Sequence, residues 1–104
     1  MVTALIVSGG KGTRMGEELP KQFLSLNGTP IIARTVMVFD GINEIDEIIL
    51  VLPKAYFTYF KELNIKTQKP IRLAEAGLDR QESVFNGLLT MTSKDNNDIV
   101  LIHD

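Results

Sequence analysis

Cysteine is absent from the 104 residues of this sequence. Without thiols the chain can form neither disulfides nor a cysteine-ligated zinc site, and its composition is compatible with a reducing compartment. Long apolar runs are lacking too, because no stretch approaches the roughly 20 residues of a membrane-spanning helix. The first apolar run, residues 4–7, follows no basic region and is too short for a signal peptide. We therefore expect a cytoplasmic protein that does not bind membranes.

An excess of positive charge is also missing. Lysine and arginine number 11 against 13 acidic residues, which gives a formal net charge of −2 and a pI of about 5.3. This balance argues against a general surface for nucleic acid or anionic lipid, so any affinity for phosphate has to be local. Hydrophobic residues make up 44% and charged residues 23%, which is ordinary for one small globular domain.

Glycine, by contrast, is concentrated near the N-terminus. Gly9, Gly10 and Gly12 follow Ser8 and the apolar run at residues 4–7, which we predict to be a buried strand. Glycines remove the Cβ atoms that keep a ligand from the backbone, and successive free N–H groups form an anion site. Cationic side chains follow in the same stretch: Lys11, Arg14 and Lys21. Together they predict a site for a polyphosphate.

Two common phosphate loops do not fit this stretch. No window supplies the Walker pattern Gly-x-x-x-x-Gly-Lys-Ser/Thr, and the dinucleotide fingerprint fails because Met15 stands where its last glycine should be. The pattern that fits is Gly-Gly-x-Gly-Thr-Arg-Met with a downstream Pro-Lys, which resembles the nucleotidyltransferase signature. The alternative is a glycine-rich turn between a strand and a helix, with incidental charges.

Apolar periodicity predicts strands that alternate with helices. We expect strands at residues 3–7, 47–52, 71–74 and 99–102. We expect helices at residues 30–40 with Thr29 as the cap, at residues 55–63, and from Arg80 onward, where Asp79 and Glu82 have capping-box spacing. The aromatic residues within 55–63 favour core packing over a stacking platform for bases. This alternation predicts a mostly parallel sheet with helices on both sides.

Three polar segments directly follow predicted strands. They are the glycine loop from Ser8, residues 77–83, and the pair His103 and Asp104. Because parallel strands end at the same edge of a sheet, where ligands bind, we expect these segments to form one site.

Taken together, the motifs at residues 9–15, 20–22, 79–84 and 103–104 resemble the 2-C-methyl-D-erythritol 4-phosphate cytidylyltransferase family. Ribitol-5-phosphate cytidylyltransferases share nearly all of them. The resemblance implies a Rossmann-like three-layer α/β nucleotidyltransferase fold with a mostly parallel sheet. It also implies that residues 1–104 are the N-terminal nucleotide-binding part of a single nucleotidyltransferase domain. A truncated, non-catalytic nucleotide-binding module is the alternative.

The resemblance implies transfer of CMP from CTP to a polyol phosphate, preferably 2-C-methyl-D-erythritol 4-phosphate, with Mg²⁺ and release of pyrophosphate. This reaction belongs to isoprenoid biosynthesis by the non-mevalonate pathway. Arg14 and Lys21 would be catalytic, and Asp104 would lie at the metal. The nucleotide-binding residues would be Ser8, Gly9, Gly10, Lys11, Gly12, Gly77, Arg80 and Ser83. The family also implies a homodimer or another form of self-association.

Several of these residues have a purely structural alternative. For Arg14 and Lys21 it is a solvated basic face balanced by neighbouring glutamates. For Asp79 and Ser83 it is a role confined to the start of the helix. We expect His103 to be a structural or orienting residue and to take no part in metal binding or proton transfer.

Overall fold

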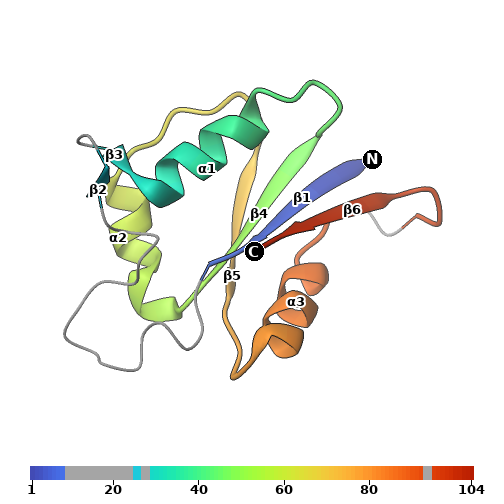
Figure 1. Ribbon diagram of the computed structural model, residues 1–104. Helices are drawn as coiled ribbons and strands as arrows, with labels where there is room; N and C mark the ends of the chain where they lie inside the picture. The colour runs from blue at the N-terminus through green and yellow to red at the C-terminus, as the bar shows by residue number, and fades with distance from the viewer. Residues whose placement is uncertain (9–24, 27–28, 93–94) are drawn as a thin grey trace.

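The computed structural model describes residues 1–8, 25–26, 29–92 and 95–104. Its central sheet has four strands, all parallel, in the order β5-β4-β1-β6 (Figure 1). The strands are β1 (Val2–Val7), β4 (Glu47–Leu52), β5 (Ile71–Glu75) and β6 (Ile99–His103). The predicted strands and their parallel arrangement are therefore confirmed.

Helices cover both faces of this sheet. On one face lie α1 (Ile31–Asp40) and α2 (Phe57–Glu62), the latter preceded by the short 3-10 helix η3 (Lys54–Tyr56). On the other face lies α3 (Arg80–Leu89), which packs beneath β5, β4 and β1. The result is a three-layer α/β arrangement, as the sequence predicted.

Strand periodicity explains how the two cores form. In β1, Ala4 and Ile6 face α1 and α2, whereas Leu5 faces α3. All six residues of β4 are buried, because the strand lies in the middle of the sheet and is covered on both faces. On the α3 side, Gly87 allows a close approach: a Cβ there would lie 2.5 Å from Leu5 Cδ1.

The aromatic residues around α2 belong to the core. Phe60 is buried, and Tyr56 and Phe57 pack against the same cluster as Ile32 and Val36 of α1. This arrangement confirms core packing over a stacking platform for bases.

One predicted helix start is wrong. Thr29 and Pro30 form the short strand β3 (Thr29–Pro30), which pairs antiparallel with β2 (Ser25–Leu26). Pro30 then takes the N-cap position of α1 without a side-chain capping bond, and the helix begins at Ile31. The reason is that the backbone of Thr29 pairs with Leu26, so Thr29 sits in an extended hairpin instead of at a cap.

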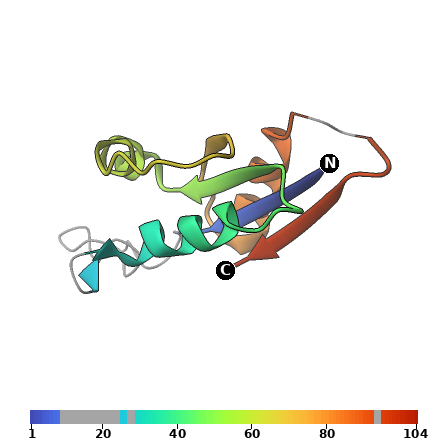
Figure 2. The ribbon, with the colours of Figure 1, turned by 90° about the horizontal axis from the view of Figure 1, so that it is seen from above.

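Strand β6 forms one edge of the sheet among the described strands, as Figure 2 shows from above. Its apolar side chains are unusually accessible: Ile99 is 53%, Leu101 46% and Ile102 45% exposed. In the part of the chain that the structure describes, no helix has the length and apolar character needed to cross a membrane.

Candidate functional site

The carboxyl ends of β1, β5 and β6 bring the described site residues to one edge of the sheet. Ser8 follows β1 and is almost fully buried, and its backbone N–H donates to the carbonyl of Val51 at 2.9 Å. The start of the glycine loop is thus held against β4. The remaining loop predictions lie outside the described residues: Gly9, Gly10, Lys11, Gly12, Arg14 and Lys21.

After β5 the chain makes a tight turn held by its own polar groups. The backbone N–H of Ala76 donates to the carbonyl of Leu52 at 2.7 Å, and that of Gly77 donates to Ser83 Oγ at 2.9 Å. Ser83 is 2% exposed, and its hydroxyl oxygen serves this turn as an acceptor. Gly77 is required here because a Cβ would collide with the side chain of Glu82.

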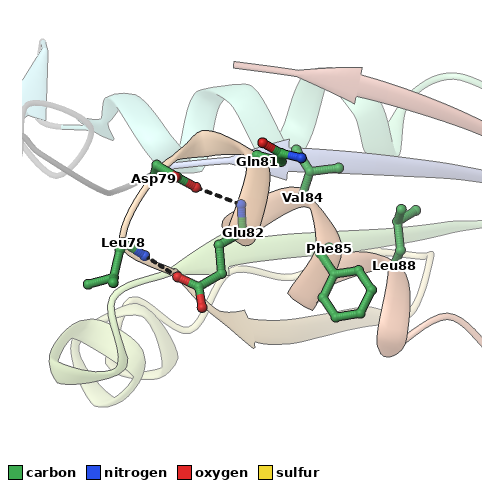
Figure 3. Close-up of a pocket in the computed structure, with 7 residues that line it drawn as sticks. All are labelled: Leu78, Asp79, Gln81, Glu82, Val84, Phe85 and Leu88. Atoms are coloured by element: carbon green, nitrogen blue, oxygen red, sulfur yellow. Dashed lines mark hydrogen bonds between the residues drawn. The ribbon is translucent and has the colours of Figure 1, made fainter.

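The first turn of α3 is capped on both sides (Figure 3). Asp79 is the N-cap residue, and its Oδ1 accepts from the backbone N–H of Glu82 at 2.8 Å. Glu82 reaches back, but its Oε1 accepts from the N–H of Leu78 at 2.6 Å, one residue before the partner that a standard capping box uses. The predicted helix start at Arg80 is confirmed, and so is the capping role of Asp79.

Arg80 and Asp104 form an ion pair at this edge. Arg80 Nε donates to Asp104 Oδ1 at 2.7 Å and its Nη2 donates to Oδ2 at 3.0 Å. The hydrogen bond from Arg80 holds the pKa of the Asp104 carboxyl below its ordinary value, and the pair raises the pKa of Arg80. Sequence reasoning placed both residues in one site but missed their contact. Their opposite charges in two segments that follow parallel strands were the available signal.

His103 points to the face of the sheet that α1 and α2 cover. Its ring packs edge to face against Phe39 of α1, with ring centroids 5.4 Å apart. This contact agrees with the structural role expected of His103.

Asp104 carries an exposed carboxylate, a type of ligand that could hold Mg²⁺. Its carboxylate is 63% exposed and lies at the edge where ligands of parallel sheets bind. Among the described residues no three acidic or histidine side chains gather into a metal-binding group. Mg²⁺ suits such a site, because it is usually held by one or two carboxylates together with substrate phosphates and water.

A pocket of about 590 Å³ lies beside the capped turn and the outer surface of α3 (Figure 3). Its lining is largely apolar, with Leu78 87% and Phe85 58% exposed. The lining includes neither Arg80 nor Asp104, nor Gly77 and Ser83. Leu78, Asp79 and Glu82 nevertheless line it, so the pocket borders the turn that carries Gly77 and Ser83.

Parallel strand order, helices on both faces and polar groups gathered at the carboxyl edge define a Rossmann-like α/β protein. Comparison with known families makes the assignment specific. The chain belongs to the 2-C-methyl-D-erythritol 4-phosphate cytidylyltransferase (IspD) family, which matches residues 2–104.

Individual relatives agree with this family. A 2-C-methyl-D-erythritol 4-phosphate cytidylyltransferase from Clostridium perfringens (strain SM101) is 49% identical over 105 residues, covering 99% of this chain and 45% of that protein. The one from Bacteroides fragilis is 44% identical, covering 98% and 46%. The crystal structure of 4-diphosphocytidyl-2C-methyl-D-erythritol synthase from Anaerococcus prevotii matches with a TM-score of 0.78 at 30% identity, covering all of this chain and 42% of that one. The chain thus spans about half the length of the relatives it matches.

Proposed function

We propose that this chain provides the nucleotide-binding part of a cytidylyltransferase that transfers CMP from CTP to 2-C-methyl-D-erythritol 4-phosphate. The observation that carries the proposal is the family match across residues 2–104. The names of the curated relatives favour this acceptor over ribitol 5-phosphate. The reaction would belong to isoprenoid biosynthesis by the non-mevalonate pathway and would take place in the cytoplasm.

In this reaction an oxygen of the acceptor phosphate attacks the α-phosphorus of CTP. A new P–O bond forms, the bond from the α-phosphorus to the bridging oxygen breaks, and pyrophosphate leaves with the electron pair. Negative charge grows on the transferred group, so catalysis depends on positioning and on fixed positive charge. Arg14 and Lys21 supply that charge in this proposal, and the backbone from Ser8 to Gly12, with Lys11, holds the triphosphate.

Mg²⁺ supplies further neutralisation of the phosphate oxygens when bound. Asp104 is the residue proposed to hold it, on the strength of its exposed carboxylate at the sheet edge. The turn from Gly77 to Ser83 is proposed to receive the cytosine side of the nucleotide. The backbone of that turn is held in place, because the N–H of Gly77 donates a hydrogen bond to Ser83 Oγ and Ser83 is buried.

Nucleotide binding tests the proposal directly. We expect calorimetry to give CTP a higher affinity than UTP, ATP or GTP. Arg14→Ala and Lys21→Ala each weaken CTP binding, and in an active enzyme each lowers turnover by roughly 10²–10³-fold, as loss of one contact to developing charge does elsewhere. Lys66→Ala is the matched control, since it removes one exposed positive charge near the amino end of β5.

Equal affinities for all four nucleotides would exclude base recognition by this chain. Turnover near the wild-type rate in both variants would refute the catalytic roles of Arg14 and Lys21. Light scattering on the same samples tests a further part of the proposal, self-association as a homodimer or larger assembly. It is motivated by the exposed apolar side chains of β6, and a clean monomer would contradict it.

A further inference from the structure

Both hydrogen bonds between Arg80 and Asp104 run in parallel. The guanidinium engages each carboxylate oxygen separately, at 2.7 and 3.0 Å. A two-point contact of this kind fixes the plane of the carboxylate as well as its position, which a single contact cannot do. Asp104 is therefore oriented by Arg80.

Arg80 is itself well placed to orient another group. It is the first residue of α3, and the backbone around it is held by the Asp79 cap, the Glu82 bond to Leu78 and the Ser83 bond to Gly77. Asp104 follows β6, which is attached to the sheet by its parallel pairing with β1. The ion pair thus joins the start of α3 to the end of β6.

Stability alone is a weak explanation for this pair. Its two side chains are 58% and 63% exposed, and ion pairs in water contribute little to folding. The carboxylate nevertheless keeps acceptor capacity. It has about four lone-pair positions, of which the arginine takes two. A cation can still approach the remaining positions.

We propose that Arg80 is a positioning residue for Asp104, which it orients toward a magnesium–nucleotide complex, and that it makes no essential contact with the base. This inference rests on the function proposed above and deepens it. It assigns Arg80 to the metal side of the site and leaves base recognition to the turn at Gly77 and Ser83.

The test is calorimetric titration of the chain with CTP, once with Mg²⁺ and once with EDTA. The variants are Arg80→Ala, Asp104→Asn, the double variant and Lys66→Ala as a charge-matched control. We expect Mg²⁺ to strengthen CTP binding to the wild-type chain and to the control. In Arg80→Ala this gain falls by roughly 10–100-fold, as it does when partners that orient metal ligands are removed. Metal-free affinity stays within about twofold of wild type, since Arg80 does not act on the nucleotide directly.

The double variant is expected to behave like Asp104→Asn, because Arg80 acts only through the carboxylate. Arg80→Lys keeps the charge without the two-point contact and should recover only part of the gain. Thermal melting of each variant checks that the fold is intact.

Several outcomes overturn the inference. Equal weakening of CTP binding with and without Mg²⁺ would make Arg80 a direct nucleotide contact. An unchanged gain from Mg²⁺ in Arg80→Ala would show that Arg80 does not act on the metal site, and a larger gain would show that its charge only repels the metal. A wild-type chain that fails to bind CTP, or an Asp104→Asn variant that keeps the full gain, would instead refute the proposed function or its metal site, and the inference with it.

Discussion

Two pairs of acidic and arginine side chains lie at opposite ends of α3, and their surroundings differ. At the amino edge of the sheet, Glu47 is 1% exposed and accepts hydrogen bonds from Thr3 at 3.0 Å and Thr92 at 3.2 Å. Arg72 lies 3.6 Å from the same carboxylate. At the carboxyl edge, Asp104 is bonded twice to Arg80, yet both side chains are more than half exposed.

The difference separates a carboxylate whose hydrogen bonds are buried in the fold from one that water can reach. Burial makes every polar partner of Glu47 important, because a buried polar group left unpaired costs free energy. Water screens the Asp104 pair, so its removal costs little stability, while its accessible oxygens remain available for binding. Exposure therefore distinguishes two ion pairs of similar chemistry.

The largest effect on stability is expected at Glu47. Glu47→Ala leaves the fully buried hydroxyl of Thr3 without its acceptor and removes the link from β4 to Thr92, which follows α3. We expect the free energy of unfolding to fall by about 2–4 kcal/mol in urea denaturation. Asp104→Ala is the matched comparison and should leave it nearly unchanged. Equal losses of unfolding free energy in the two variants would contradict the difference between the buried and the exposed carboxylate.

A smaller effect is expected in the turn that supports Arg80. In Gly77→Ala the new methyl group would lie 2.5 Å from Glu82 Cβ, so the start of α3 has to shift as well as the Glu82 side chain, which then releases the N–H of Leu78. Loss of that hydrogen bond together with the shift of the turn should cost about 1–2 kcal/mol. The double variant Gly77→Ala/Glu82→Gly removes both Cβ and Cγ of residue 82 and should be no less stable than Glu82→Gly alone, as urea denaturation would reveal. Additive losses would mean that the methyl group disturbs something other than Glu82.

The smallest effect concerns the acid dependence of the exposed pair. The Arg80 hydrogen bond lowers the folded pKa of Asp104 below its ordinary value of 3.8. The pair's contribution is therefore present above that value and is lost as the pH falls through the folded pKa. Carbon-13 NMR of the Asp104 carboxyl should give a lower pKa in the wild-type chain than in Arg80→Ala. Identical values in the two proteins would contradict the ion pair in solution.

Much of this fold follows from local sequence patterns. The apolar run of β4 and the capping spacing of Asp79 and Glu82 each predicted an element at its observed position. The hairpin at residues 25–30 was missed, because Thr before Pro is also a good start for a helix. Pairing of Thr29 with Leu26 outweighed that local preference.

The site was harder to predict than the fold. The rule for parallel sheets brought Ser8, Gly77 and Asp104 to one edge, but it says nothing of which side chains touch. The contact between Arg80 and Asp104 depends on the path of α3 beneath the sheet and on the reach of a long side chain. Leu78 shows the same limit, since it contributes its backbone N–H to the cap while its side chain lies in solvent.

The parallel pairing of β6 with β1 also has a kinetic consequence. It sets Ile6 opposite His103, so the sheet joins segments from nearly the full span of the described sequence. Such distant contacts are slow to form, because the chain loses entropy when the long loop closes and gains the stabilising contacts only afterwards. During synthesis β1, β4 and β5 leave the ribosome before β6. Arg80 can pair with Asp104 only after the chain has been made 24 residues further. A molecule in which β6 has not yet docked would lack the Arg80–Asp104 pair, so under the function proposed above Mg²⁺-dependent CTP binding would report on the final step of folding.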